Sequence, residues 1–194
     1  MTPHRPVFWG LFFPLFFVLL IVSFVGRYDD EHVVEVASSG RVTAGFWACI
    51  AADGGALALA ETPEHMNRFG YINILETTML PAVRPLRPEG IRLMQDNAPI
   101  HNAGDTREFL RDAGVDVINW PPYSPDLNPI ENVWGMMVRE WDSRREATRE
   151  ALAAHVQEVW GTWQRRGGLV TQLVDSMPRR LQAVIDAQGG HTKY

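Results

Sequence analysis

Lysine is almost absent from this 194-residue chain: Lys193 is the only lysine among 18 basic residues, and all the others are arginines. The formal net charge is −5 at pH 7, which argues against a protein that binds nucleic acid by bulk positive charge alone. Paired arginines late in the chain, such as Arg179 and Arg180, are interpreted as solvated helix faces or as a local phosphate-contacting surface. Cys49 is the single cysteine, so the chain has no internal disulfide and suits a reducing compartment.

Charge is also absent from residues 7–26. This run is long enough for a membrane-spanning helix, which needs about 20 apolar residues. A signal peptide is the nearest alternative, although its apolar region usually covers only about 7–15 residues and no clear small-residue cleavage site follows here. A third interpretation is foreign sequence, or a misplaced start of the reading frame. We therefore treat residues 1–26 as a separate hydrophobic segment and residues 27–194 as the folded domain.

The remainder of the chain has the pattern of a layered domain. Apolar residues alternate from Val42 to Ile50, which predicts a strand, and the ADGG sequence at 52–55 predicts a hairpin turn. Short strands are expected at GIRLMQ and VDVIN. Helices are expected around 67–80, after Asp105, from Pro129, and at about 144–165 and 169–187. This order predicts an α/β domain in which helices pack on a mixed sheet.

Asp96 and Glu131 are the candidate metal-binding carboxylates. Asp96 follows a buried strand, and open α/β sheets bind ligands beyond the carboxyl ends of their strands. Glu131 stands in the first turn of a helix, where Mg²⁺ could be shared between the two oxygen ligands during phosphoryl transfer. The simpler interpretation is local: Asp96 opens a turn, and Asn128, Pro129 and Glu131 form a capping box. Spacing alone leaves both interpretations open.

Two longer motifs, MQDNAPIHNA around Asp96 and WPPYSPDLNPIENVWG around Glu131, closely resemble the catalytic domain of Tc/mariner-type transposases of the DDE superfamily. The resemblance runs from about Arg27 to the last residue, through GRVTAGFWACIAADGG, YINILETTMLP and SMPRRLQAVIDAQGGHTKY. It implies a ribonuclease H-like mixed sheet with flanking helices. It also implies two Mg²⁺ or Mn²⁺ ions held by two aspartates and a glutamate. With these ions, members of the family cleave DNA and join its 3′ end to a target. On this resemblance Asp96 is the second carboxylate and Glu131 the third.

The first carboxylate of the family stands on an opening strand, in a segment that resembles FSDE. The corresponding residues 7–26 contain no acid, so we expect a sheet that lacks its first strand and is preceded by an apolar helix, although the apolar run could supply part of a substitute strand. Asp29 and Asp30 lie in YDDE, which looks like the motif but matches the family's linking segment better. Asp30 is therefore a third metal ligand that we do not favour.

The hypothesis that follows is a transposase-derived domain that is an inactive remnant with a partial metal site. One alternative is a working DNA strand-transfer nuclease that uses Asp96, Glu131 and an acid from 29–31. Another is a membrane-tethered, non-catalytic module that reuses the fold. The resemblance implies a nuclear protein with DNA as its partner, bound weakly because no helix-turn-helix module precedes the domain. A membrane, through residues 7–26, and a second copy of the chain are the other candidate partners.

Two further interpretations concern single side chains. His101 could orient a phosphate near Asp96, but a surface position or a place ahead of a helix is the simpler expectation. Trp134, Met137, Val138 and Trp141 follow one another at helical intervals and are expected to lie in the core.

Overall fold

The computed structural model describes residues 20–25, 44–51, 55–121, 124, 127–140, 148–190 and 192, and for 20–25 it describes the path of the backbone. Within this part of the chain a five-stranded sheet has the order β3-β2-β1-β4-β5. Its strands are β1 (Leu20–Val25), β2 (Gly45–Ala51), β3 (Gly55–Thr62), β4 (Ile91–Gln95) and β5 (Val115–Val117). β1 pairs antiparallel to β2 and parallel to β4, so the sheet is mixed.

The sheet therefore has a first strand, and the expectation that this strand is missing is wrong. β1 is built from LIVSFV, the end of the apolar run, and lies at the centre of the sheet. A strand between two neighbours reads as a continuous apolar run, because both of its faces are covered and its backbone groups are paired on both sides. A short apolar run of this kind is not distinguishable from a helical one by periodicity alone. The sequence pattern predicts that the folded domain starts at residue 27, but the sheet begins earlier, at Leu20.

The predicted apolar helix is wrong for residues 20–25, and residues 7–19 and Gly26 lie outside the described part of the chain. None of the described helices is both long enough and apolar enough to cross a membrane. The predicted hairpin is confirmed as the antiparallel pair of β2 and β3.

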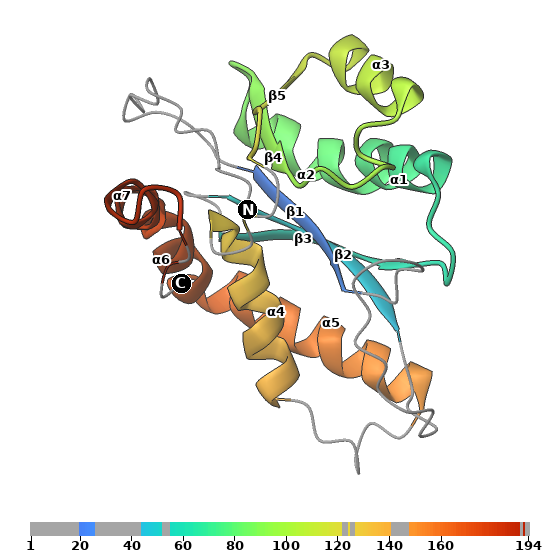
Figure 1. Cartoon of the computed structure of the whole chain (residues 1–194). Helices are drawn as coiled ribbons and strands as arrows, with labels where there is room; N and C mark the ends of the chain where they lie inside the picture. Colours follow the sequence, from blue (N-terminus) through green and yellow to red (C-terminus); the bar gives the residue numbers. More distant parts are fainter. Residues whose placement is uncertain are drawn as a thin grey trace.

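Helices cover both faces of the sheet (Figure 1). One face carries α1 (Arg68–Ile74), a π-helical turn (Leu75–Met79), α2 (Leu80–Val83), a 3-10 turn (Arg84–Leu86) and α3 (Gly104–Asp112). The other face carries α4 (Pro129–Glu140), α5 (Arg149–Arg166), α6 (Leu169–Asp175) and α7 (Met177–Asp186). The helix expected over 169–187 is divided in two at Ser176, because Pro178 follows in the first turn of α7 and has no N–H with which to continue α6.

Two hydrophobic clusters hold these layers together. The α4-side core joins Phe46, Ala48, Ile50 and Met94 of the sheet to residues of α4 to α7, including Ile130, Val133, Trp134, Trp160 and Val170. The α1-side core joins Trp47, Cys49 and Leu93 to residues of the opposite helices, including Tyr71, Leu75, Met79 and Leu110. Successive residues of β2 therefore enter opposite cores, as the alternation of a strand requires.

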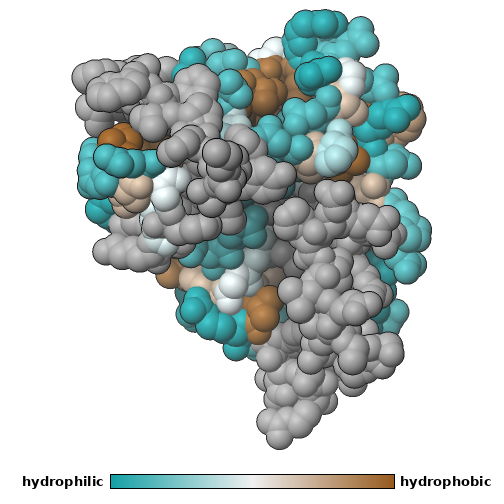
Figure 2. Space-filling view, in the orientation of Figure 1, coloured by the Kyte–Doolittle hydropathy of each residue, from teal (hydrophilic) through white to brown (hydrophobic). Residues whose placement is uncertain are grey.

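The expected core residues of α4 are partly confirmed. Trp134 and Met137 are buried, whereas Val138 is exposed and Trp141 lies outside the described residues. The remaining large exposed apolar side chains include Phe69, Leu86, Leu169 and Ile185. On the face seen in Figure 2, the described residues are mostly hydrophilic and the hydrophobic areas between them are small and separate. Single exposed apolar residues of this kind are normal for a folded domain.

Candidate carboxylate site

Asp96 lies directly after the last residue of β4, as predicted. Its Oδ1 accepts a hydrogen bond from the backbone N–H of Ala98 at 3.0 Å, which closes a small turn at the end of the strand. The same Oδ1 lies 2.6 Å from Nδ1 of His101. The Asp96 side chain is 53% exposed, so its carboxylate faces solvent on one side while the imidazole holds it on the other.

His101 is fully buried, so its expected surface position is wrong, whereas the alternative, a place ahead of a helix, is correct, since α3 begins at Gly104. The sequence Ala98-Pro99-Ile100-His101 forms a turn in which the N–H of His101 donates to the carbonyl of Ala98 at 2.9 Å. Proline suits the second position of such a turn because its φ is already set. The turn returns the chain beneath Asp96 and brings the imidazole under the carboxylate.

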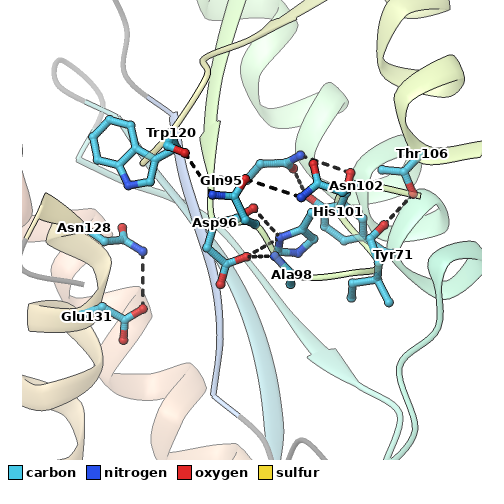
Figure 3. A network of polar contacts seen from close by, with 12 residues as sticks. Tyr71, Gln95, Asp96, Ala98, His101, Asn102, Thr106, Trp120, Asn128 and Glu131 are labelled. Carbon is cyan, nitrogen blue, oxygen red and sulfur yellow. Dashed lines mark hydrogen bonds and ion pairs between the residues drawn. The ribbon is translucent and has the colours of Figure 1, made fainter. Parts of the chain in front are cut away.

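A buried polar network supports the imidazole (Figure 3). The Tyr71 ring lies 4.4 Å from the His101 ring, centroid to centroid. The Tyr71 hydroxyl donates to Oε1 of Gln95 at 2.6 Å, and Nε2 of Gln95 donates to the carbonyl of His101 at 3.4 Å. Tyr71 comes from α1 and Gln95 from β4, so the network joins two elements beneath the turn. Sequence reasoning missed this network, since no local pattern pairs residue 71 with residue 95.

The pKa of Asp96 is set by opposing effects. Burial acts to raise the pKa of the carboxyl, but the hydrogen bond and the charge of His101, together with the N–H of Ala98, lower it further than burial raises it. The net pKa is lower than usual, so the carboxylate is ionised at neutral pH. An ionised carboxylate only accepts hydrogen bonds, and Nδ1 of His101 must therefore carry the proton between them.

Glu131 lies in the first turn of α4, as predicted, and is exposed. Its N–H donates to the carbonyl of Asn128 at 3.1 Å, and its Oε1 accepts from Nδ2 of Asn128 at 3.4 Å. The local interpretation is therefore correct in part, since Asn128 and Glu131 do contact each other at the helix start. The Asn128 amide, however, donates to the Glu131 side chain, whereas in a capping box the first residue accepts from the backbone of the fourth.

The elements that carry Asp96 and Glu131 lie on either side of one strand. β4 pairs with β1, and α4 contacts β1. Figure 3 shows Asp96 and Glu131 in one close-up, with β1 passing between them in that view. Within the residues that the structure describes, no group of three or more His, Cys, Asp or Glu side chains is placed to hold a metal ion. Asp29 and Asp30 lie outside these residues.

A family model described as DDE superfamily endonuclease matches residues 27–153. The chain belongs to this family. Among its relatives, the Tcb2 transposase of Caenorhabditis briggsae is 34% identical over 169 residues, which is 87% of this chain and 60% of the relative. The Tc1 transposase of Caenorhabditis elegans is 34% identical over 168 residues, with the same coverage. This DDE domain thus has Tc/mariner-type relatives, as the motifs suggested, and it spans about 60% of their length.

Solved structures agree with the fold. The catalytic domain of Mos1 mariner transposase superposes with a TM-score of 0.68 at 17% identity, over 90% of this chain and 84% of that chain. The Mos1 mariner paired end complex with Mn gives 0.72 at 18% identity, over 91% of this chain and 56% of that one. The ribonuclease H-like architecture is therefore confirmed.

The ligand set that the family resemblance implies is not complete in the described part of this DDE domain. Two carboxylates are present on suitable elements, Asp96 at a strand end and Glu131 at a helix start. No third acid joins them there. The described residues therefore do not fit a site for two divalent ions.

Proposed function

We propose that this chain is a transposase-derived DDE domain that retains the fold but does not cleave or join DNA. The observation that supports the proposal is the incomplete carboxylate set. Asp96 follows β4 and Glu131 stands on α4, two elements that both contact β1, and no third acid gathers with them among the described residues. Phosphoryl transfer with two ions needs both ions fixed on either side of the phosphorus. Because a small error in the position of the reacting groups lowers the rate strongly, a site that lacks one of its ligands is expected to lose its turnover.

DNA is the partner that we propose, bound weakly through the backbone phosphates. Not every arginine pair is available for this contact. Arg165, Arg166 and Arg179 are exposed, but Arg180 is buried. Its Nε donates to Oγ of Ser176 and its Nη2 to Oδ1 of Asn132, both at 2.7 Å. Arg180 therefore joins α7 to α4, and the phosphate-contacting interpretation applies only to the exposed arginines.

A nicking assay tests the proposal. Supercoiled plasmid is incubated with the full chain and Mn²⁺ or Mg²⁺, and the wild type is compared with Asp96→Asn and Glu131→Gln. We expect equal, background levels of nicked DNA from all three. Metal-dependent nicking by the wild type that Glu131→Gln abolishes would show a working nuclease instead. Asp30→Asn in the same assay then shows whether an acid from 29–31 completes the site.

The described strand β1 argues against the membrane-tethered module. Residues 20–25 are paired inside the sheet, which leaves residues 7–19 as the apolar remainder. That remainder is shorter than the roughly 20 residues of a spanning helix. We propose the nucleus as the location, on the ground of family membership. A carbonate wash of a membrane fraction tests the membrane anchor, since an anchored chain stays in the pellet. Size-exclusion chromatography tests the predicted homodimer.

A further inference from the structure

We propose that Ser23 of β1 stands at the position where a third carboxylate would complete the site, so that a serine replaces the acid in this chain. This inference rests on the proposed function, because it explains why the site of Asp96 and Glu131 is incomplete. It differs from the expectation that the strand is lost: the strand is present, and one residue on it has the wrong chemistry.

The pairing of β1 with β4 supplies the first argument. Leu20 pairs with Leu93, Ile21 with Met94 and Val22 with Gln95. Continued by one residue, this register sets position 23 beside Asp96. Neighbouring strands lie about 4.8 Å apart, so no other position of β1 is closer to the backbone of Asp96.

The second argument comes from the faces of the sheet. Ser23 pairs with Ala48 of β2, and Ala48 belongs to the α4-side core with Ile130. Met94, two residues before Asp96, belongs to the same core. Because directly paired positions share a face, position 23 lies on the face that α4 covers, and Asp96 follows the last residue of β4 at the end of the neighbouring strand. Glu131 is the residue after Ile130 on that helix.

The neighbouring positions of β1 do not meet both conditions. Val22 and Phe24 pair with Cys49 and Trp47, and both partners belong to the α1-side core. Ile21 shares the face of position 23 but pairs with Met94, two residues before Asp96. Position 23 alone within β1 is both level with Asp96 and on the side of α4.

The chemistry of serine explains the consequence. A carboxylate contributes two oxygen acceptors and a negative charge, whereas a hydroxyl contributes one neutral oxygen. Hard divalent cations select for charged oxygen ligands, and the number of such ligands tunes affinity. With serine at position 23, Asp96 and Glu131 are the two charged ligands that the described residues offer.

Binding of Mn²⁺ alone to the full chain tests the inference. Its affinity is measured by electron paramagnetic resonance or calorimetry for the wild type, Ser23→Asp and Ser23→Asn. We expect Ser23→Asp to bind Mn²⁺ about tenfold more tightly or better, because a charged ligand has been added. Ser23→Asn, which matches aspartate in size but not in charge, is expected to bind like the wild type. Asp96→Asn or Glu131→Gln in the Ser23→Asp background is expected to remove the gain.

A disulfide pair tests the register without relying on charge, and it serves if Ser23→Asp fails to fold. In a Cys49→Ala background, Ser23→Cys with Asp96→Cys is expected to form a bond on mild oxidation, because adjacent strand positions have Cα atoms within the range of about 4.4–6.8 Å that a disulfide requires. Ser23→Cys with Asp116→Cys is the control, since β5 lies one strand beyond β4.

Three results would overturn the inference. One is a folded Ser23→Asp protein whose Mn²⁺ affinity equals that of the wild type. Another is a Ser23→Cys, Asp96→Cys pair that stays reduced like its control. The third is tight Mn²⁺ binding by the wild type that Asp30→Asn removes, because the third ligand would then lie at 30. None of these depends on DNA, so failure of the proposed function, seen as metal-dependent nicking by the wild type, is observed separately.

Discussion

Nδ1 of His101 lies 2.6 Å from Oδ1 of Asp96, so a fully buried imidazole holds a half-exposed carboxylate at the end of β4. The Ala98–His101 turn brings the ring to this place, and Tyr71 covers one side of it. The position of the carboxylate is therefore set from inside the domain. Because the His101 side chain is buried, the Ala98–His101 turn is anchored in the interior, and changes to His101 should alter the free energy of unfolding.

Replacing His101 by alanine is expected to destabilise the domain by about 2–4 kcal/mol, because it leaves a cavity beside Tyr71 and removes a hydrogen bond to a charged group. Urea unfolding at neutral pH, followed by circular dichroism, measures the change. Asn102→Ala is the matched control: Asn102 is the next residue, is exposed, and its side-chain amide donates to Oδ1 of Asn97 at the long distance of 3.5 Å. Its effect is expected to stay within about 0.5 kcal/mol. Equal effects of the two variants would show that the imidazole contact is not structural.

The lowered pKa of Asp96 predicts a dependence of stability on pH. A carboxyl whose pKa is lower in the folded state than in the unfolded state stabilises the fold at pH values above the unfolded pKa, about 3.9 for aspartate. This stabilisation is lost as the pH falls through the lower, folded pKa. The free energy of unfolding of Asp96→Asn should therefore fall below that of the wild type at pH 6, and the two should converge towards pH 2. Urea titrations across this range decide it, and a gap that stays constant with pH would contradict the prediction.

The two carboxylates illustrate what the sequence reveals about the site and what it does not. Two boundaries beside the carboxylates follow from local sequence signals. The apolar run before Asp96 predicts a strand that ends there, and Pro129 predicts the start of the helix that carries Glu131. The structure confirms both, since β4 ends at Gln95 and α4 begins at Pro129. The sequence alone does not decide between β1 and a helix, because a central strand and a spanning helix are both uninterrupted apolar runs. The place of His101 depends on Tyr71 and Gln95, which are far from it in sequence or on another element. Such contacts follow from tertiary packing, so no window of local sequence predicts them.

Cys49 is expected to be inert to thiol reagents in the folded protein. It is fully buried in the α1-side core, and burial raises the pKa of its thiol well above the ordinary value. The reactive species is the thiolate, so both access and ionisation are suppressed. After addition of Ellman's reagent, the absorbance should show no release of thionitrobenzoate over minutes in native buffer. In guanidinium chloride it should show the release of one equivalent. Rapid release under native conditions would mean that β2 opens readily.

The adjacent residues Arg179 and Arg180 provide an internal comparison of surface and core. Arg180 is 2% exposed and donates to Ser176 and to Asn132 of α4, whereas Arg179 is exposed on α7. Removing the Arg180 side chain takes away the hydrogen-bond donor to Asn132 and leaves a space between α7 and α4. Arg180→Ala is therefore expected to cost about 2–4 kcal/mol of unfolding free energy, and Arg179→Ala less than about 0.5 kcal/mol.

For DNA affinity we expect the reverse order of effects: the Arg179 variant is impaired and the Arg180 variant is not. If exposed arginines contact phosphates, Arg179→Ala weakens binding and makes it less dependent on salt, since each phosphate contact adds to the salt dependence. Filter binding over a series of salt concentrations, at a temperature where both variants are folded, measures this. A folded Arg180→Ala protein is expected to bind DNA like the wild type. If Arg180→Ala weakens binding at full folding while Arg179→Ala does not, the structural role of Arg180 is the wrong description.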